Sequence, residues 1–424
     1  SIEGVKKANS YGIDVLITDR HLPAEDLPDA KFIVNPNQTE CHFPSKNLCG
    51  VGVIFYVLLS LRKELRKLNR YLTKPEPILS DLLDLVALGT IADLVKLDFN
   101  NRILVNYGMK KMRSGNCNFG IEALARLSKK KLSNMKTSDL SFSIAPKINA
   151  AGRLDDMAIG IKCLIASSKN EAENYAKQLV VFNEQRKLVE NKMKDEALSI
   201  LSDCIIEGDY TIVMYDKHWH QGVVGILASR LKEKYYRPTI IFAKDDGGLL
   251  KGSGRSIASF HLKDALDLVS KKNPDLILTF GGHAMAAGLT IKQENFKLFC
   301  VEFARIAKEL LSPDDLNLII EFDKAIPTKY LNHETIKTIN SQIWGQGFPP
   351  PIFYGIFDVV RQEIVADKHN KCLVKNEYGI YDAIIFNFSQ VLADRIEVTH
   401  TIELNEFNQK SSIQLIIKSQ NEKK

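Results

Sequence analysis

Residues 169–201 contain neither glycine nor proline, and no other segment restricts the fold of this chain as strongly. Because these two residues are the usual helix breakers, so long a segment without them predicts one continuous helix. Its apolar residues recur at steps of three or four with a gap at Arg186: Ala172, Ala176, Leu179, Phe182, Val189, Met193 and Ala197. The charged residues between them are expected to form a solvated face: Glu184, Arg186, Lys187, Glu190, Lys192 and Lys194. The segment is therefore predicted to be an amphipathic connector between two folded parts.

Alternating strand and helix patterns lie on both sides of this connector and predict an α/β fold. Before it, we expect a parallel sheet covered by helices, with strands at 14–18 and 31–34 and helices at 51–68, 80–88, 101–112 and 121–127. After it, residues 205–312 predict a second α/β domain, with strands at 210–215, 239–243, 276–280 and 289–291 and helices at 223–234, 262–269 and 294–311.

The pattern changes again from about residue 318. A Trp-Gly-Gln-Gly-Phe segment at 344–348 and three prolines at 349–351 predict a rigid turn. Short alternating runs follow the turn, at 356–360, 362–366, 371–374, 381–386, 397–404 and 412–417. Many short strands separated by Asn, Gly and Asp turns are typical of a small barrel or sandwich.

Length and charge narrow the class of protein. At 424 residues the chain is too long for one hydrophobic core, and about two to four domains are expected. A net charge of +6 tolerates a polyanionic ligand without requiring one, so a nucleic-acid ligand must be argued from local motifs. The seven cysteines include no Cys-x-x-Cys pair, which argues against a disulfide framework or zinc knuckle and indicates a reducing compartment. The longest apolar stretch, 51–61, is too short to span a bilayer.

The start of the chain has an unusual order of elements. A helical pattern at 1–10 leads directly into the strand at 14–18. A helix that feeds a buried strand is the second half of a βαβ unit. Because no strand precedes this helix and the chain begins at Ser1, we expect the N-terminal part of the first domain to be missing from this sequence.

Residues 280–288 read Phe-Gly-Gly-His-Ala-Met-Ala-Ala-Gly and follow an apolar run. Glycines let a ligand approach the backbone closely, and exposed N–H groups beside a histidine suit an anion such as phosphate. Gly281, Gly282 and His283 are therefore candidate ligand-binding residues. A tight turn between two strands with a filler histidine explains the same residues equally well.

Segment 147–153 combines small residues with an amide and a guanidinium. Arg153 can grip a phosphate through paired hydrogen bonds, with Asn149 nearby in the sequence. The alternative is a surface arginine paired with Asp155 or Asp156.

Segment 251–256 repeats this chemistry with Arg255 and two hydroxyl groups, one of them on Ser253. We expect both segments to be loops. Two such loops together with the Gly-Gly-His motif indicate a ligand with several phosphates.

Two acidic positions are candidate metal ligands. Asp19 and His21 stand where the first predicted strand ends, the edge at which open α/β sheets bind ligands, and such a pair suits a hard divalent metal. A capping aspartate with exposed neighbours is the alternative. Asp93 lies in the apolar run 88–95, where a buried lone carboxylate is costly unless it is paired or metal-bound. A helix cap would also satisfy Asp93.

The remaining histidines are less informative. Trp219 and His220 precede the helix at 223–234, whose N-terminus could accept an anion, or they are a packing tryptophan and a polar cap. Four others have no recognisable sequence partners and are expected to be ordinary surface or core residues: His261, His333, His369 and His400.

Taken together, these motifs resemble the RecJ family of single-stranded-DNA-specific 5′→3′ exonucleases, within the DHH phosphoesterase superfamily. The resemblance extends over essentially all 424 residues and rests on segments 18–23, 50–53, 87–93, 149–156, 219–225, 252–256 and 281–288. It implies a DHH domain at 1–168 without its N-terminal part, a connector helix at 169–204, a DHHA1 domain at 205–314 and a single-strand-binding OB-fold barrel at 315–424.

The resemblance also implies an activity: stepwise release of 5′-mononucleotides from single-stranded DNA in repair and recombination, with Mn²⁺ or Mg²⁺ as cofactor. It gives catalytic roles to His21 and Asp93 and metal binding to Asp93 and Asp19. It gives substrate binding to Asn149, Arg153, Ser253, Arg255, Gly281, Gly282 and His283, with Arg153, Ser253 and Arg255 on the 5′-terminal phosphate. It further implies a monomeric cytoplasmic protein, with a single-strand-binding protein and a recombination helicase as partners and no membrane.

One motif departs from the family pattern. The superfamily motif is Asp-His-His, and this chain has Arg20 between Asp19 and His21. Arg20 replaces the histidine expected to bind metal, and a guanidinium stays cationic and cannot coordinate an ion. The family's upstream aspartate motifs would precede Ser1. We therefore expect no hydrolysis by this chain, and the alternative function is single-stranded DNA binding without catalysis on the same scaffold. A small-phosphate substrate is a third reading, which the connector and the barrel argue against.

Overall fold

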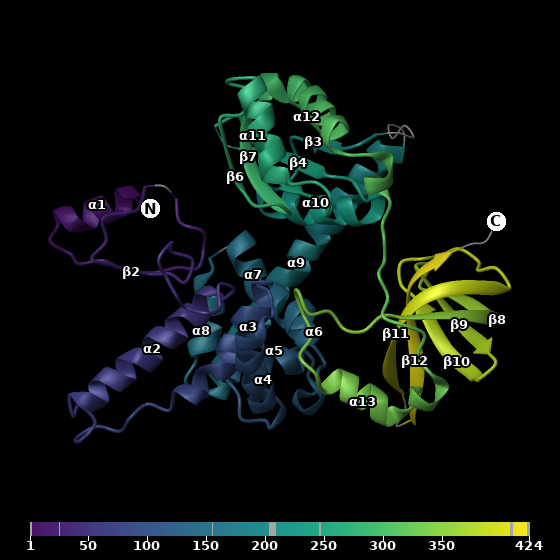
Figure 1. The fold of residues 1–424 in the computed structure, drawn as a ribbon, viewed down its shortest axis with the longest axis horizontal. Coiled ribbons are helices and arrows are strands. Elements are labelled where there is room, and N and C mark those ends of the chain that lie inside the picture. The colour runs from purple at the N-terminus through teal and green to yellow at the C-terminus, as the bar shows by residue number, and fades with distance from the viewer. Residues whose placement is uncertain are drawn as a thin grey trace. The chain divides into compact units, whose positions relative to one another are not determined.

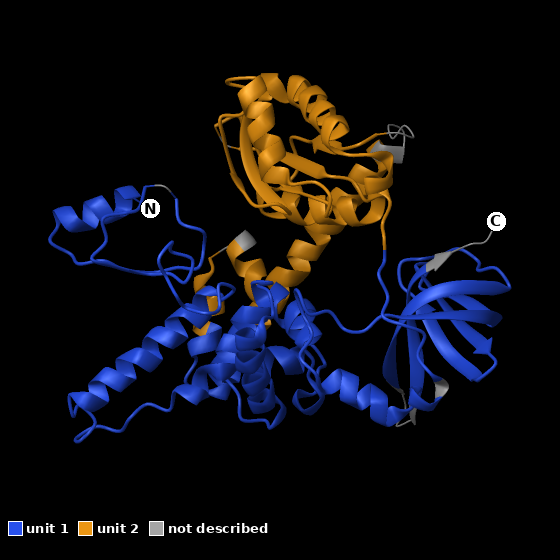
Figure 2. Ribbon diagram, viewed as in Figure 1, with its two compact units in different colours: residues 1–146, 163–176, 320–424 blue, residues 147–162, 177–319 orange. Residues whose placement is uncertain are grey.

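The computed structural model describes residues 2–24, 26–154, 156–202, 209–245, 247–407 and 410–421. The chain divides into two compact units (Figure 2). Unit 1 comprises residues 1–146, 163–176 and 320–424, and unit 2 comprises residues 147–162 and 177–319.

Unit 1 begins with helix α1 and a small parallel sheet, and continues as a helical bundle (Figure 1). Strands β1 (Leu16–Thr18) and β2 (Phe32–Val34) pair in parallel, with Ile17 opposite Ile33, so both strands end at the same edge of the sheet. The main helices are α1 (Ile2–Ser10), α2 (Gly50–Lys67), α3 (Leu83–Ala92), α4 (Phe99–Arg113), α5 (Phe119–Leu127) and, later in the chain, α13 (His333–Ser341). The parallel pairing confirms the expectation for this region, although among the described residues the sheet has only these two strands.

The connector is confirmed as a 34-residue helix, α9 (Lys169–Ser202). It follows two shorter helices, α7 (Ala145–Leu154) and α8 (Ala158–Ile165). Among the described helices, none has the length and apolar character needed to cross a membrane.

The prediction that all charged residues of α9 are solvated is wrong for two of them. Arg186 and Glu190 are buried, and Arg186 Nη1 lies 2.6 Å from Glu190 Oε2. Arg230 Nε lies 3.1 Å from the other oxygen of Glu190. The gap in the apolar pattern at Arg186 is therefore a core position held by an ion pair, because a buried charge needs a partner.

Unit 2 contains a five-stranded sheet in the order β3-β4-β5-β7-β6. Its strands are β3 (Ile212–Tyr215), β4 (Thr239–Lys244), β5 (Leu249–Arg255), β6 (Thr279–Gly282) and β7 (Ala286–Lys292). Its helices are α10 (Gln221–Tyr235), α11 (Leu262–Lys272) and α12 (Phe296–Leu310). Strands β3 and β4 are parallel, and the other pairs are antiparallel.

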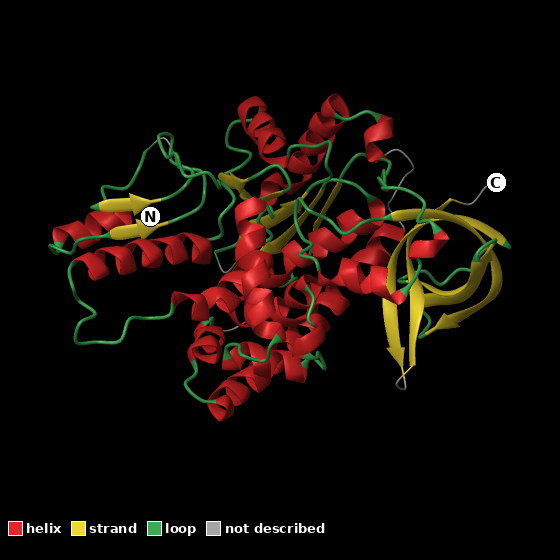
Figure 3. Cartoon of the chain, turned by 60° about the horizontal axis from the view of Figure 1, so that its bottom comes forward, coloured by secondary structure: helices red, strands yellow, loops and turns green. Residues whose placement is uncertain are grey.

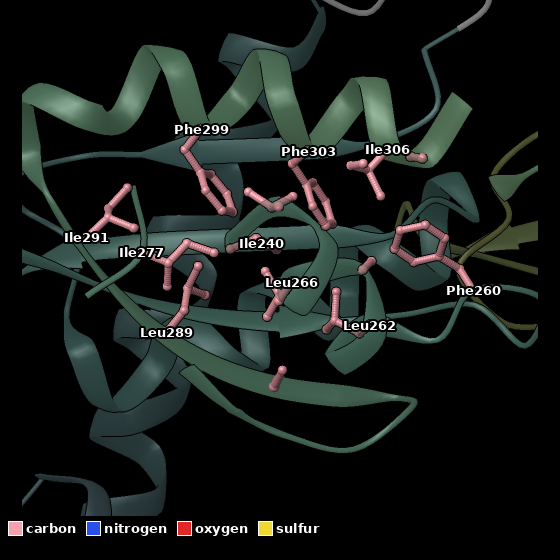
Figure 4. Close-up of a cluster of buried hydrophobic side chains, with 14 of the residues drawn as sticks. Ile240, Phe260, Leu262, Leu266, Ile277, Leu289, Ile291, Phe299, Phe303 and Ile306 are labelled. Atoms are coloured by element: carbon pink, nitrogen blue, oxygen red, sulfur yellow. The ribbon is translucent and has the colours of Figure 1, made fainter. Parts of the chain in front are cut away.

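The two faces of this sheet carry separate cores. Alternate residues of β4 point to opposite faces, so Ile240 and Phe242 pack with α11 and α12, while Ile241 and Ala243 pack with α9 and α10. In Figure 4, Phe299 and Phe303 of α12 extend into the first of these cores. Their rings are stacked, with centroids 5.7 Å apart.

Segment 251–256 was expected to be a loop, but residues 251–255 lie in the central strand β5. Gly252 and Gly254 face the core beneath α11, where an added Cβ would come within 2.5 Å of Phe242 and 2.7 Å of Leu262. The glycines thus make room for large neighbours within the sheet. The prediction of a loop from these glycines is wrong because tertiary packing, rather than local propensity, determines the conformation of the segment.

The C-terminal part of unit 1 is a closed barrel in the order β10-β12-β11-β8-β9, which Figure 3 shows in yellow. Its strands are β8 (Phe353–Val365), β9 (His369–Asn376), β10 (Gly379–Ile385), β11 (Arg395–Phe407) and β12 (Lys410–Asn421). The predicted barrel is confirmed, and the two runs expected at 356–366 form one strand with an irregularity between Val359 and Arg361.

Candidate functional site

The first group of predicted site residues stands where β1 ends. The Asp19 carboxylate accepts hydrogen bonds from the backbone N–H groups of Arg20 and His21, at 2.7 and 3.2 Å. Its Oδ1 also lies 2.8 Å from Nδ1 of His21. Burial favours the neutral acid, but these hydrogen bonds from His21 and Arg20 prevail and hold the pKa of Asp19 below its ordinary value. Asp19 is thus an anion that orients His21.

Two asparagines that the sequence reading did not single out hold this loop in place. Asn35 is buried just after β2 and donates through Nδ2 to the carbonyl of His21 at 2.8 Å. Asn37 donates through Nδ2 to the carbonyl of Arg20 at 2.6 Å. The available signal was an Asn-Pro-Asn segment directly after the second parallel strand, at the same sheet edge as Asp19.

Arg20 and Asp93 form an ion pair. Arg20 Nη2 donates to Asp93 Oδ1 at 2.7 Å, and the two side chains are 29% and 35% exposed. The expected burial of Asp93 is wrong, because the apolar run of α3 ends at Ala92 and Asp93 is the C-terminal capping residue. Pairing, one of the outcomes that the sequence left open for this carboxylate, is what the structure shows. Asp93 is paired with a cation of its own chain.

The residues at this site do not fit a divalent metal. The guanidinium of Arg20 is paired with the Asp93 carboxylate, and its positive charge would repel an incoming metal ion. Within the described ranges, no group of three or more His, Cys, Asp or Glu side chains comes together as a metal site. A metal at Asp93 would therefore require Arg20 to leave.

The second group of predicted residues lies in unit 2, on the face of β5 opposite its glycines. Ser253 and Arg255 are half-buried there, and Arg255 Nη1 donates to Ser253 Oγ at 3.2 Å and to the Gly254 carbonyl at 2.8 Å. Helix α10 approaches them at Gly225, where an added Cβ would lie 2.9 Å from Ser253 Oγ and 3.0 Å from Arg255 Nη2. The structure thus brings Ser253 and Arg255 together beside a glycine of α10.

The Gly-Gly-His motif forms a hairpin rather than an open loop. Gly281 pairs with Gly288, which in turn pairs with Ser253, so three small residues make one row across β6, β7 and β5. A Cβ on Gly281 would have nothing within 4 Å. His283 lies in the turn of this hairpin, as one of the two sequence interpretations expected, and its N–H donates to the Ala286 carbonyl at 2.8 Å. What remains for a ligand is a bare backbone surface next to Ser253.

The remaining candidate residues lie on helices or pack in the core, and one side chain lies outside the described residues. Segment 147–153, expected to be a loop, lies instead in helix α7. Asn149 is exposed on this helix, and the side chain of Arg153 lies outside the described residues. Trp219 is buried and donates through Nε1 to Glu196 at 3.0 Å, while His220 caps α10 by accepting from the Gly222 N–H at 3.0 Å. The packing-and-cap alternative therefore explains Trp219 and His220.

The barrel offers aromatic rings at its surface. Phe322 is 50% exposed and stacks on Tyr354 of β8, with ring centroids 5.1 Å apart. Tyr378 and Phe386 are also more than half exposed. Exposed rings on a small barrel are the platforms on which single-stranded bases stack.

Family models match three parts of the chain. The DHH family N-terminal domain matches residues 1–90, the DHHA1 domain matches residues 208–309 and the RecJ OB domain matches residues 322–419.

Whole-chain comparisons agree with these matches. The single-stranded-DNA-specific exonuclease RecJ of Haemophilus influenzae is 43% identical over 98% of this chain, which spans 75% of that relative. Crystal structures of RecJ from Thermus thermophilus superpose with TM-scores of 0.82 for the Mn²⁺ complex and 0.79 for the Mg²⁺ complex, each at 25% identity. They cover 100% and 97% of this chain, which spans 60% of each crystallised chain.

Proposed function

This chain belongs to the RecJ family of single-stranded-DNA-specific exonucleases, and from that premise we propose that it engages the 5′ end of single-stranded DNA in repair and recombination. In the family mode we propose, hydrolysis proceeds 5′→3′ and releases 5′-mononucleotides. We further propose that Arg20 withholds hydrolysis in this chain, so that it binds DNA without cutting it. The single observation that carries this proposal is the 2.7 Å contact between Arg20 and Asp93.

Binding of the trailing strand is supported by the barrel. Phe322 is 50% exposed and stacks on the half-buried Tyr354, so it offers a ring surface that accepts any base, and stacking contributes roughly 1–3 kcal/mol per base. The free edges that an open sheet would expose are absent from a closed barrel, so its strands present side chains rather than backbone to the ligand.

Recognition of the 5′-terminal phosphate is assigned by this proposal to Ser253 and Arg255, with Arg153 and Asn149 as further contacts. Arg255 donates hydrogen bonds to Ser253 Oγ and to the Gly254 carbonyl, which orient its guanidinium. A guanidinium carries five N–H donors in a planar fork that matches a phosphate. The uncovered backbone of Gly281, with Gly282 and His283 beside it, would line the wall of the same surface. A guanidinium, a hydroxyl and uncovered backbone together suit a dianionic phosphate.

We propose that this chain differs from its solved relatives in how it binds a divalent cation. The Thermus structures are named as complexes with Mn²⁺ and with Mg²⁺. Such an ion supplies Lewis-acid assistance to phosphodiester hydrolysis when it is bound. We propose that Arg20 takes its place at Asp93, leaving Asp19 and His21 without a metal partner.

A second candidate is hydrolysis by this chain itself. It is favoured by the position of His21 and Asp19, which stand together at the carboxyl end of a parallel strand. On this reading Arg20 would leave Asp93 when substrate and metal bind.

Nucleotide release from 5′-phosphorylated single-stranded DNA with Mn²⁺ distinguishes the two candidates, with binding of the same oligonucleotide measured in parallel by fluorescence anisotropy. We expect binding without release. Robust release of mononucleotides would overturn the assignment of Arg20, and absence of binding would overturn the DNA-binding role.

The family resemblance also supports further parts of the proposal. We propose a single-strand-binding protein and a recombination helicase as partners of a monomeric, cytoplasmic chain. The domain limits at 168, 204 and 314 likewise remain a proposal.

A further inference from the structure

A hollow in unit 1 lies between α4 and the segment that leaves α13. It has a volume of about 470 Å³ and is lined by one stripe of α4 and by residues 341–343. A second hollow of about 380 Å³ shares Arg113 and Ser341 with the first, so the two form one groove. None of these residues belongs to the sites described above.

The groove carries positive charge. Among the described residues that line the two hollows, the charged side chains are all cations: Arg102, Lys110, Arg113, Lys136 and Lys337. Arg113 donates to two carbonyl groups, those of Met135 at 2.9 Å and Ser341 at 3.2 Å. Within the described part of the chain, Arg102, Lys110 and Lys337 form no ion pair, and Lys136 has Glu403 at 3.3 Å. The groove therefore carries positive charge that the protein itself hardly neutralises.

Arg102 is held by aromatic rings rather than by a carboxylate. Its guanidinium carbon lies 3.8 Å from the centre of the Phe348 ring, which stacks on Trp344 at 5.2 Å. The Nε of Arg102 is buried without an acceptor among the described residues. A cation that is fixed by stacking and left without a counter-ion is suited to an external anion.

An extended polyanion fits the groove better than one phosphate. Arg102 and Arg113 lie eleven positions apart on α4, which is about 16 Å at 1.5 Å per residue. Exposed rings stand on the same helix, with Phe99 79% and Tyr107 57% exposed. Spaced cations with interleaved rings are the pattern that binds a single strand through phosphates and bases.

The groove also continues toward the site at Asp93. A third hollow of about 440 Å³ shares Lys136 and Asn340 with the second, and it is lined by the proline turn, by barrel strands and by Leu94, the neighbour of Asp93. We propose that the groove between α4 and α13 binds the sugar–phosphate backbone of a single DNA strand, as an additional track beyond the barrel. This inference rests on the proposed DNA-binding function and extends it to a new surface.

The test uses the full chain and a fluorescent oligothymidylate, with the dissociation constant measured by anisotropy across a range of salt concentrations. The variant Lys110→Gln/Lys337→Gln removes two exposed cations of the groove. We expect roughly tenfold weaker binding at low salt and a salt slope smaller by about 1.4, since each contact with a single strand contributes about 0.7. The control Lys63→Gln/Lys74→Gln removes two exposed cations elsewhere and should bind like the parent.

Two further variants test whether the loss of binding comes from the groove itself. Arg102→Gln removes the stacked guanidinium and should weaken binding in the same direction, while Phe322→Ala tests the barrel alone. If Phe322→Ala weakens binding and the groove variants bind like the parent with an unchanged slope, the groove proposal fails and the proposed function stands. If the parent does not bind single strands, both fail.

Two competition outcomes identify a different occupant. If the groove variants lose affinity for duplex DNA as strongly as for single strands, a single-strand track is refuted. If they lose affinity for poly-glutamate but not for the oligonucleotide, the groove accepts an acidic polypeptide and the proposal is overturned.

Discussion

The guanidinium of Arg20 lies 2.7 Å from the carboxylate of Asp93, although 73 residues separate them in the sequence. The contact joins the end of β1 to the end of α3 and places a fixed positive charge at the carboxylate that the family resemblance assigns to metal binding. The site is therefore electrostatically satisfied by the protein itself.

Replacing Arg20 with histidine should open the site to a divalent ion. Arg20→His removes the cation and supplies a neutral imidazole, so we expect binding of Mn²⁺ to strengthen at least tenfold. The loss of free Mn²⁺ signal in electron paramagnetic resonance measures this directly, without reference to activity. Arg20→Gln is the control, because it removes the charge but adds only a weak ligand. Equal Mn²⁺ affinity in the parent and Arg20→His would contradict our account.

The buried ion pair on α9 predicts a large stability effect. Glu190→Gln leaves Arg186 and Arg230 without their shared carboxylate, and breaking a buried pair costs about 3 kcal/mol. Urea unfolding followed by Trp219 fluorescence in a Trp344→Phe background reports on unit 2. The exposed neighbour Glu184→Gln should change stability by less than about 0.5 kcal/mol. A similar small change for Glu190→Gln would show that the pair contributes little.

His400 should make the barrel sensitive to acid. It is buried between Phe353 and Phe357, and burial lowers its pKa from 6.5 to about 4, opposed by a backbone hydrogen bond at Thr401. Between these values the unfolded chain binds the proton and the folded chain does not, so stability falls as the pH drops from about 6.5 to about 4. The loss amounts to about 3 kcal/mol.

The comparison that isolates this effect is His400→Leu. Unfolding of the parent and the variant should be followed by Trp344 fluorescence in a Trp219→Phe background at pH 7 and pH 4. We expect the variant to lose less stability on acidification than the parent. The same acid dependence in both proteins would assign it to other groups.

The phosphate contacts of unit 2 predict a change in end preference. Arg255→Ala and Arg153→Ala should each reduce the ratio of affinities for 5′-phosphate and 5′-hydroxyl oligonucleotides by roughly tenfold, because charge-assisted hydrogen bonds contribute about 1.5–3 kcal/mol. Parallel titrations with the two oligonucleotides measure the ratio. An equal loss for both ends would assign these arginines to general charge rather than to the terminal phosphate.

A substitution at Gly225 tests the same prediction by steric crowding of Arg255 rather than by removal of its charge. Gly225→Ala would place a methyl group 2.9 Å from Ser253 Oγ and 3.0 Å from Arg255 Nη2. We expect a similar loss of 5′-phosphate preference without any loss of charge. Gly50→Ala is a suitable control, because an added Cβ there has nothing within 4 Å.

Much of the fold could be read from local pattern. The connector helix, the parallel pair β1 and β2 and most barrel strands follow from periodicity and from the positions of glycine and proline. The pattern misled where packing overrode local preference. The glycines of β5 indicated a loop, but they lie in the centre of a sheet because Phe242 and Leu262 fill the space that their side chains would occupy.

The sequence by itself determined the family, the chemistry of each motif and the replacement of a histidine by Arg20, since these depend on residue identity and order. Only the tertiary structure decided that Arg20 pairs with Asp93, that Arg186 is a core residue and that the cations of α4 lie in one groove with Lys337 of α13. The physical reason is the same in each case. Ion pairs and grooves join residues that are distant along the chain, and their energies depend on distance and burial, which no local pattern contains.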